Sequence, residues 1–327
     1  MTWWPLIKVL PQKTNFSFVK YARLAAALSI VLCAASIIGC FYPGLNMGID
    51  FRGGASMEVF KPAGQSINAE AIRTAVAGLD IGDVGVQGIA RRDSNIDDGS
   101  TAIVRFQVPE GRDQTAVVNS VQTAINQAVG QVSYSGVEVV GSKVSGELFT
   151  SGLLALGVAI LLMFAYIWFR FEPQFGFGAI AGLLHDVILT FGLIVLFKLE
   201  FSLNMVAAIL TVIGYSMNDT VVVFDRLREN LRKYKTMPLR EVIDLSLNET
   251  LSRTIITGVT AVMVLAALAI FGGEALFGFS IALMFGIIIG TYSSIYVGAP
   301  IILLWGVKRG ELAEDAKPVK LGMASRP

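Results

Sequence analysis

Apolar residues fall into six long runs along this chain, and polar residues are concentrated between the runs. Each run is long enough, at 1.5 Å per helical residue, to cross a hydrocarbon core about 30 Å thick. The pattern therefore predicts six transmembrane helices, at residues 24–42, 148–168, 175–197, 203–224, 255–271 and 276–305.

The segment 43–147, between the first two runs, has a different pattern. Alternation predicts strands at 55–61, 84–91, 101–108 and 132–140, and helical periodicity predicts helices at 68–79, with Asn68 as N-cap, and at 112–129, with a turn at 93–100. This order is that of the ferredoxin-like split motif. The predicted fold class is an α-helical membrane protein with six transmembrane helices and an external α/β ferredoxin-like (βαββαβ) domain between helices 1 and 2. The domain shows no catalytic constellation, which favours a binding or lever role and leaves a spacer role open.

The composition agrees with a membrane protein, because 54% of the 327 residues are hydrophobic and 16% are charged. A net charge of +1 provides no basic field for nucleic acid. The single histidine, His185, excludes a multi-histidine metal site, and Cys33 and Cys40 lie two helical turns apart, too far to bridge each other. We expect no cofactor, no metal and no enzymatic activity.

Basic residues mark the cytoplasmic side of a membrane protein. Seventeen of the 26 Lys and Arg residues lie in the N-terminal segment 1–23, in the loop around Arg170, in the loop 225–254 and in the tail 306–327. Both termini are therefore predicted to be cytoplasmic, and the domain 43–147 to be translocated to the other side of the membrane; in a bacterial inner membrane that side is the periplasm.

One carboxylate, Asp219, falls inside the fourth apolar run, about 24 Å along the predicted helix. Ionised carboxylates are costly in hydrocarbon and usually mark ion or proton paths. Arg253, at the start of the fifth helix, has a side chain long enough to reach toward it. A static ion pair that fixes helix register is the alternative. The other polar residues expected at this level are Asn218, Thr220, Thr257, Ser293 and Ser294.

The third predicted helix carries His185 and Asp186 near the membrane midplane. Adjacent helical residues point about 100° apart, so at least one of the two is expected to face the bundle interior or a partner. A packing or hydrogen-bonding role and a proton-relay role are both open for this pair.

Three further patterns concern helix packing and the cytoplasmic side. Residues 238–251 have one apolar stripe and are predicted to form a helix on the inner membrane surface. The pairs Gly178/Gly182 and Gly286/Gly290 suit close helix approach. A solvated ionic collar is expected from Asp225, Arg226, Arg228 and Glu229.

Several of these motifs carry a resemblance to a known family. They are Gly48–Gly54 (GIDFRGG), Phe169–Glu172 (FRFE), His185–Asp186, the block 214–230, Leu251–Thr254 (LSRT) and Gly290–Ser294 (GTYSS). Over about residues 20–310 the chain resembles the SecF-type members of the SecD/SecF family of protein-export membrane proteins.

The resemblance implies a multi-pass protein of the bacterial inner membrane that pairs with a separate SecD chain in an assembly of the resistance-nodulation-division type. It also implies association with SecYEG, SecA, YajC and YidC, with membrane lipids and with exported unfolded polypeptides, and protons as the coupling ion. Asp219 and Arg253 then match proton-path positions, and Asp50, Arg52, Gly53 and Gly54 form a motif that couples helix movement to the external domain. The alternatives are a passive translocon scaffold, or half of a proton-driven small-molecule or lipid exporter.

Overall fold

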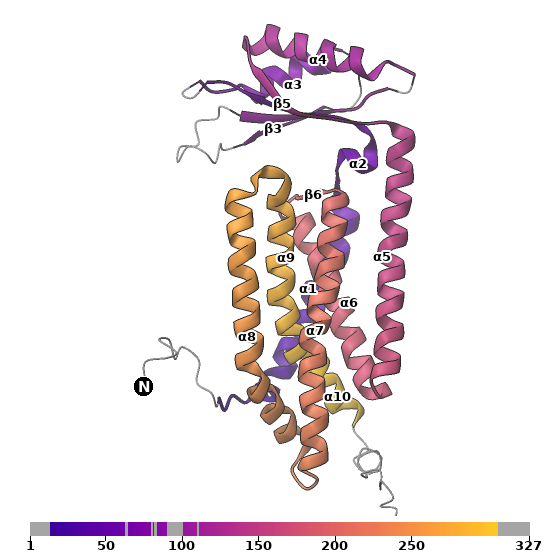
Figure 1. Ribbon diagram of the computed structural model, residues 1–327, viewed down its shortest axis with the longest axis vertical. Coiled ribbons are helices and arrows are strands. Elements are labelled where there is room, and N and C mark those ends of the chain that lie inside the picture. Colours follow the sequence, from indigo (N-terminus) through magenta and orange to yellow (C-terminus); the bar gives the residue numbers. More distant parts are fainter. Residues whose placement is uncertain are drawn as a thin grey trace, which may run out of the picture.

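The computed structural model describes residues 14–62, 65–79, 81, 84–89, 101–109 and 111–306. The predicted turn 93–100, the end of the predicted strand 84–91, and most of the segments 1–23 and 306–327 lie outside the described residues. A long helical bundle carries a small α/β domain stacked on one end (Figure 1).

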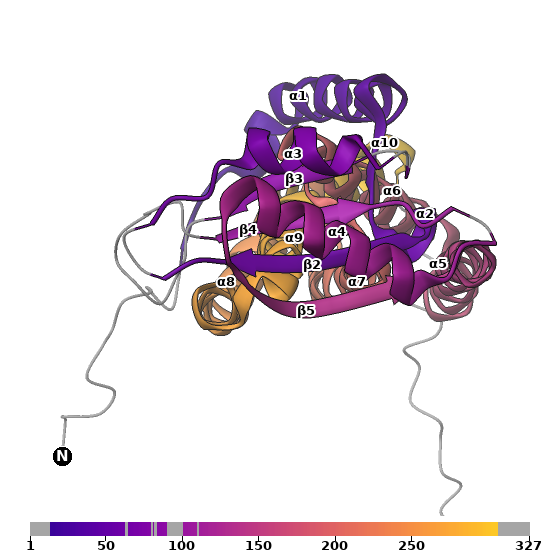
Figure 2. The ribbon, with the colours of Figure 1, turned by 90° about the horizontal axis from the view of Figure 1, so that it is seen from above.

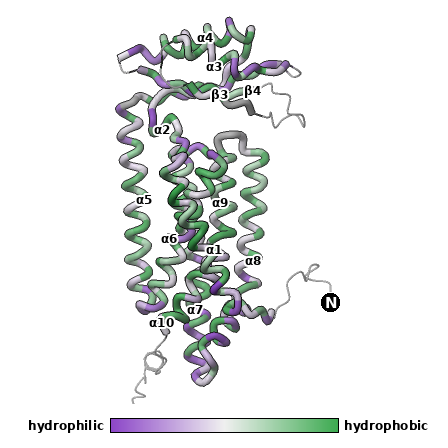
Figure 3. Tube along the Cα trace, turned by 180° about the vertical axis from the view of Figure 1, so that it is seen from behind, coloured by the Kyte–Doolittle hydropathy of each residue, from purple (hydrophilic) through white to green (hydrophobic). Residues whose placement is uncertain are grey.

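The predicted six spans are confirmed as six helices that are long and apolar enough to cross a membrane, within the described residues. Apolar residues run along the length of this bundle, and hydrophilic residues gather in the α/β domain and at the opposite end (Figure 3). The helices are α1 (Phe18–Gly39, continued by η1, Cys40–Gly44), α5 (Ser142–Arg170), α6 (Pro173–Leu196), α7 (Leu203–Lys233), α8 (Leu239–Phe271) and α9 (Gly273–Ser293, continued by η2, Ser294–Gly298, and α10, Ala299–Trp305).

The prediction of a separate surface helix at 238–251 was wrong. Those residues form the first turns of α8, which continues without a break into the membrane span. Val242, Ile243 and Leu247 are buried in the same hydrophobic core as Leu227 and Leu231 from the end of α7. The apolar stripe therefore packs against a neighbouring helix and not against lipid.

The centre of the bundle is formed by α6 and α7, the most deeply buried spans, while α1, α5 and α8 lie at the periphery with much of their surface exposed (Figure 2). Glycines set the spacing of the central helices. A Cβ at Gly290 would lie 3.0 Å from Ser216 Cβ, and a Cβ at Gly178 would lie 2.7 Å from the Gly298 carbonyl oxygen. The predicted close approach at both glycine pairs is therefore confirmed.

The external domain has a four-stranded antiparallel sheet in the order β3-β4-β2-β5. Its strands are β2 (Gly54–Phe60), β3 (Val84–Ile89), β4 (Thr101–Phe106) and β5 (Ser133–Val140). Helices α3 (Ala69–Ala77) and α4 (Gln114–Val129) cover one face (Figure 2). The predicted N-cap is confirmed, because the Asn68 side chain accepts from the amides of Glu70 and Ala71. The apolar residues Val117, Val121 and Ile125, spaced four positions apart on α4, are buried.

Short elements join this domain to the bundle. They are β1 (Asn46–Met47), α2 (Ile49–Arg52) and β6 (Glu200–Phe201). Strand β1 pairs in parallel with β6, which lies directly before α7. The root of the external domain is thus attached to the start of a central helix.

Candidate functional site

The polar residues inside the bundle form hydrogen-bonded groups at the contacts between helices. The larger group is centred on Asp186 of α6, which is fully buried. Its Oδ2 accepts from Ser216 Oγ of α7 at 2.5 Å and from Ser293 Oγ of α9 at 2.7 Å. One carboxylate therefore connects α6, α7 and α9.

His185 extends this group to α1. Its Nδ1 lies 2.9 Å from Asp186 Oδ1, and its Nε2 lies 3.2 Å from Ser29 Oγ. Ser29 Oγ lies 3.0 Å from the Tyr292 hydroxyl, which donates to the Ala25 carbonyl. A carboxylate beside Nδ1 favours a proton on that nitrogen. The prediction that at least one of the two faces the interior is confirmed: Asp186 points toward α7 and α9, and His185 toward α1.

Asp219 of α7 lies at the contact between α7 and α9 and is 3% exposed. Its Oδ2 accepts from Thr291 Oγ1 at 3.0 Å. About one turn further on, at the start of η2, Ser294 Oγ lies 2.8 Å from Thr220 Oγ1. The structure thus brings together the polar residues of the fourth and sixth spans that the sequence places at one depth, with Ser293 directed to Asp186 and not to Asp219.

The fifth span contributes less than expected. Arg253 is exposed, and within the described residues it forms no ion pair with Asp219, although its charge lies within electrostatic reach. Thr257 donates to the Arg253 carbonyl of its own helix at 2.9 Å, and Asn218 is exposed on the outside of α7. These three residues do not join the network. The expected contact is not formed because α8 turns the neighbouring residue, Thr254, inward, and Arg253 projects about 100° away from it.

Two buried hydroxyls on α7 and α8 form no hydrogen bond to the described residues. They belong to Tyr215, one helical turn before Asp219, and to Thr254 of α8. Buried polar groups are normally paired, because an unpaired one carries a desolvation cost. Of the two, the Tyr215 hydroxyl lies within electrostatic reach of Asp219.

The predicted coupling motif lies at the root of the external domain. Asp50 Oδ2 accepts from the backbone amide of Leu203 at 2.8 Å, and Leu203 is the first residue of α7. The Gly48 amide donates to the Phe201 carbonyl at 2.9 Å. Because a helix N-terminus attracts negative charge, Asp50 stabilises the start of the helix that carries Asp219.

Two glycines of this motif occupy positions that require glycine. Gly53 and Gly54 have φ of 73° and 125°, and a Cβ at Gly54 would lie 2.3 Å from the Phe106 carbonyl oxygen. Arg52 is exposed beside them. The two glycines therefore let β2 enter the sheet directly from α2.

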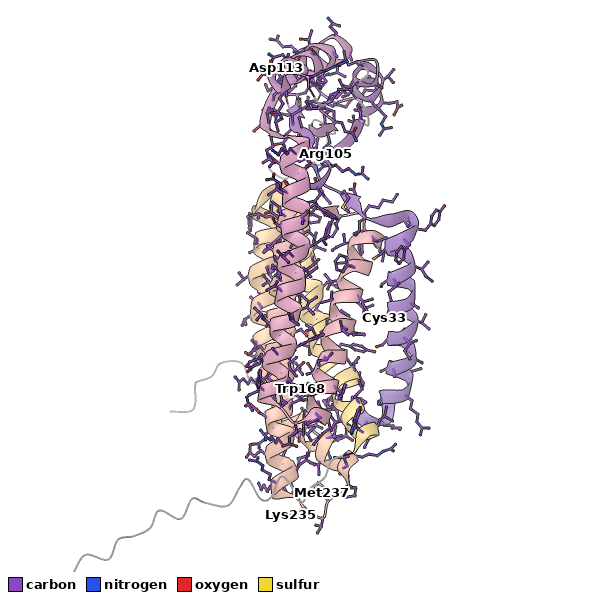
Figure 4. All side chains as sticks on the ribbon, turned by 90° about the vertical axis from the view of Figure 1, so that its right-hand side faces the viewer. Cys33, Arg105, Asp113, Trp168, Lys235 and Met237 are labelled. Atoms are coloured by element: carbon purple, nitrogen blue, oxygen red, sulfur yellow. The ribbon has the colours of Figure 1, made fainter. Side chains whose placement is uncertain are left out.

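An ion pair that the sequence did not predict connects the external domain to the bundle. Arg105 Nη2 of β4 lies 2.5 Å from Glu200 Oε2 of β6, and Figure 4 places Arg105 between the domain and the helices. Burial raises the pKa of Glu200, while the charge of Arg105 acts in the opposite direction. These residues lie 95 positions apart in the sequence, and no local pattern links them.

The predicted ionic collar exists, with partners on other helices. Arg170 Nη2 lies 2.8 and 2.7 Å from the two carboxylate oxygens of Asp225, and Arg228 Nη2 lies 3.0 Å from Glu172 Oε1. Arg226 binds Glu229 and Glu249. The turn between α5 and α6 is thus held to α7. No group of three or more potential metal ligands occurs among the described residues.

Two family models match the chain. Residues 120–308 match the C-terminal model of the protein export membrane proteins SecD and SecF, and residues 43–59 match the SecD/SecF GG motif. The second match contains Asp50, Gly53 and Gly54, and the first contains Asp186 and Asp219.

Relatives named protein translocase subunit SecF match over nearly their whole length. The protein from Cereibacter sphaeroides is 44% identical over 95% of this chain and 96% of its own, and that from Rhodobacter capsulatus is 43% identical over 94% of each. The protein from Rickettsia rickettsii is 40% identical over 91% of this chain and 94% of its own.

Solved structures give the same result for the fold. A crystal structure of SecDF, a translocon-associated membrane protein from Thermus thermophilus, aligns with a TM-score of 0.79 and 29% identity over 91% of this chain. A second SecDF structure, in a super-membrane-facing form, aligns with a TM-score of 0.62 and 28% identity over 95%. This chain spans 39% and 41% of those two chains. The family models, the relatives and the coincidence of the matched segments with the site show that the chain belongs to the SecD/SecF family of protein-export membrane proteins, among the members named SecF.

Proposed function

We propose that this chain, with a separate SecD partner, uses the proton motive force to help exported polypeptides complete their passage through a translocon. The family membership supports a role in protein export, and the relatives are named as translocase subunits. The observation that supports the proton-driven part is Asp219, a buried carboxylate within a long apolar helix that forms one hydrogen bond, to Thr291, and no ion pair among the described residues.

Two opposing effects act on the charge of a carboxylate in such surroundings. Desolvation favours the protonated form, and the nearby charge of Arg253 favours the ionised form. Moving one charge through 100 mV is worth about 2.3 kcal/mol, which is enough to shift a balanced two-state element. Asp219 is therefore the proposed proton carrier, and Asp186 with His185 is a second candidate along the path.

The structure offers a physical route from proton transfer to the external domain. Asp219 lies on α7, and the first residue of α7 is bonded to Asp50 at the root of that domain. A movement of α7 that accompanies protonation would therefore act on α2, β1 and β6 together. We assign the external domain to the ferredoxin-like class, because its element order and its antiparallel sheet order β3-β4-β2-β5 fit the split motif.

Movement of this domain is also suggested by the SecDF structures. One of them is described as a super-membrane-facing form, and this chain aligns less closely with it than with the other. In the proposed cycle, the external domain would swing and hold an emerging polypeptide against backsliding. The proposed partners are SecD, SecYEG, SecA, YajC, YidC and the exported polypeptide. The proposed location is the bacterial inner membrane, with both termini in the cytoplasm.

The test is an export assay in vesicles with and without an imposed proton gradient. Asp219→Asn preserves the size and a hydrogen-bond acceptor but cannot ionise, so we expect normal assembly and loss of the gradient-dependent part of export. Asp113→Asn is the matched control, because Asp113 is an exposed N-cap of α4 and asparagine caps equally well. Full gradient-dependent export by Asp219→Asn would reject the proton role. A contribution to export that survives an uncoupler would favour the scaffold alternative.

A further inference from the structure

A cavity opens at the cytoplasmic end of the bundle, beside the turn between α5 and α6. It has a volume of about 520 Å³ and is lined by Arg170, Asp225, Arg228, Glu229, Arg232 and Lys233. That volume lies within the range of small-molecule binding pockets. The lining contains four basic and two acidic side chains, so the cavity has an excess of positive charge.

The pairing within the cavity concentrates this excess on two residues. Asp225 is bound by Arg170, Glu229 is bound by Arg226 from outside the lining, and Arg228 is bound by Glu172. Within the described residues, Arg232 and Lys233 form no ion pair, and the Lys233 ammonium lies 5.1 Å from the centre of the Tyr234 ring. Arg232 Nε is buried and has no hydrogen-bond acceptor among the described residues. The Lys233 charge also acts on Glu249 of α8, with which it forms no ion pair among the described residues. The positive charge of Arg232, and part of that of Lys233, is therefore available for an anion.

The depth of the cavity corresponds to the lipid headgroup region. Asp225 lies 22 residues beyond Leu203 on α7, or about 33 Å, and Arg232 lies about 43 Å beyond it. The cavity therefore starts where a hydrocarbon core of about 30 Å ends and extends through the headgroup layer. Two exposed tryptophans support the placement of the cavity in the headgroup layer. Trp168 is 63% exposed just before Arg170, near the lower end of α5 in Figure 4. Trp305 is 61% exposed at the end of α10. Tryptophan is enriched at the membrane–water interface.

We propose that this cavity binds the phosphate of an anionic phospholipid from the cytoplasmic leaflet, with Arg232 and Lys233 as the main anion contacts. An arginine can bind phosphate through two parallel hydrogen bonds, and a lysine adds a point charge. The exposed apolar surface of α5 next to the cavity, with Leu161, Leu162 and Phe169, would accommodate the acyl chains. A lipid satisfies both features, because its phosphate and its chains are joined at the same level.

The experiment uses the full chain in detergent and in lipid nanodiscs, with lipid binding measured by native mass spectrometry. The probes are phosphatidylglycerol and phosphatidylcholine of the same chain length, and sn-glycerol 3-phosphate as a soluble phosphate. The test variant is Arg232→Gln with Lys233→Gln, which leaves the Arg170–Asp225 and Arg228–Glu172 pairs intact. The control variant is Arg240→Gln with Lys20→Gln. Both control residues are exposed on the cytoplasmic side, and Lys20 also lies over a neighbouring tyrosine ring.

We expect the native chain to retain phosphatidylglycerol in preference to phosphatidylcholine. The test variant should lose about 30-fold in affinity, the factor expected when two basic residues leave an anionic surface, and the control variant should bind like the native chain. Equal losses in both variants would show a diffuse surface charge and overturn the proposal, as would equal retention of the two lipids. Full competition by sn-glycerol 3-phosphate would show a site for soluble phosphates and also overturn it.

Discussion

The bond between Asp50 and α7 allows a sharp test of how the external domain is attached to the bundle. Asp50→Ala removes the acceptor of the Leu203 amide and the negative charge at the start of α7. Asp50→Asn keeps an acceptor and removes only the charge. The two variants therefore separate the hydrogen bond from the electrostatic effect.

The expected loss of stability at the start of α7 follows from the two interactions that Asp50 makes there. Loss of a helix cap costs about 0.5–2 kcal/mol, and loss of a charge at a helix N-terminus costs about 0.3–1 kcal/mol. Asp50→Ala should therefore destabilise the first turn of α7 by about 1–3 kcal/mol, and Asp50→Asn by less than about 1 kcal/mol. A change of 1–3 kcal/mol corresponds to about 5–150-fold in an equilibrium between closed and open states.

The assay is hydrogen exchange of the amides at the start of α7 in the intact protein. Asp50→Ala should accelerate exchange there by that factor, and Asp50→Asn by a smaller one. Asp113→Ala provides the control, because it removes the cap of α4, in the external domain, and should leave α7 unchanged. Unchanged exchange at Leu203 in Asp50→Ala would refute the inference that Asp50 holds α7.

Three further predictions follow from packing and from pKa values. A Cβ at Gly286 would lie 2.2 Å from Val212 Cγ2, so Gly286→Ala should destabilise the detergent-solubilised protein by about 1–3 kcal/mol. Adding Val212→Ala should restore the stability. The control is Gly214→Ala, whose Cβ would have no heavy atom within 4 Å and which should have little effect on the melting temperature. Burial raises the pKa of Tyr134 to about 12 from an ordinary 10, so the contribution of Tyr134 to stability is present below pH 10 and is lost as the pH rises to 12. An absorbance titration should show an ionisation step near pH 12 that Tyr134→Phe removes. Burial also raises the pKa of Glu200 above 4.5, so the contribution of Glu200 to stability is present below pH 4.5 and is lost as the pH rises through the raised pKa. Glu200→Gln should abolish that part of the pH dependence of the melting temperature. An unchanged profile would contradict the raised pKa of Glu200.

Most of the architecture could be predicted from the sequence, because a bilayer imposes a length on every span and a sheet imposes alternation. Local chemistry was also predictable, as at Asn68, whose side chain has few uses other than capping in that position. The error at 238–251 shows where such reasoning stops. An apolar stripe with Val242 and Ile243 has the same pattern whether a membrane surface or another helix covers it.

The sequence predicted the depth of the site residues along their helices, but not which of them form hydrogen bonds with each other. The level shared by Asp219, Thr291 and Ser294 follows from counting residues along helices. Which hydroxyl binds which carboxylate depends on the rotation and register of the helices, set by contacts such as Gly290 against Ser216. For that reason neither the exposed orientation of Arg253 nor the link from Ser293 to Asp186 was foreseen.

The central claim is that Asp219 takes up and releases a proton while the protein works. The direct measurement is a pH-dependent infrared difference spectrum of the carboxyl C=O stretch, recorded on the assembled complex in vesicles for the native chain and for Asp219→Asn. The account predicts a band in the native spectrum that follows pH and is missing in Asp219→Asn. A native complex that exports polypeptides with full gradient dependence, and yet shows no difference in this band from Asp219→Asn at any pH, would contradict it.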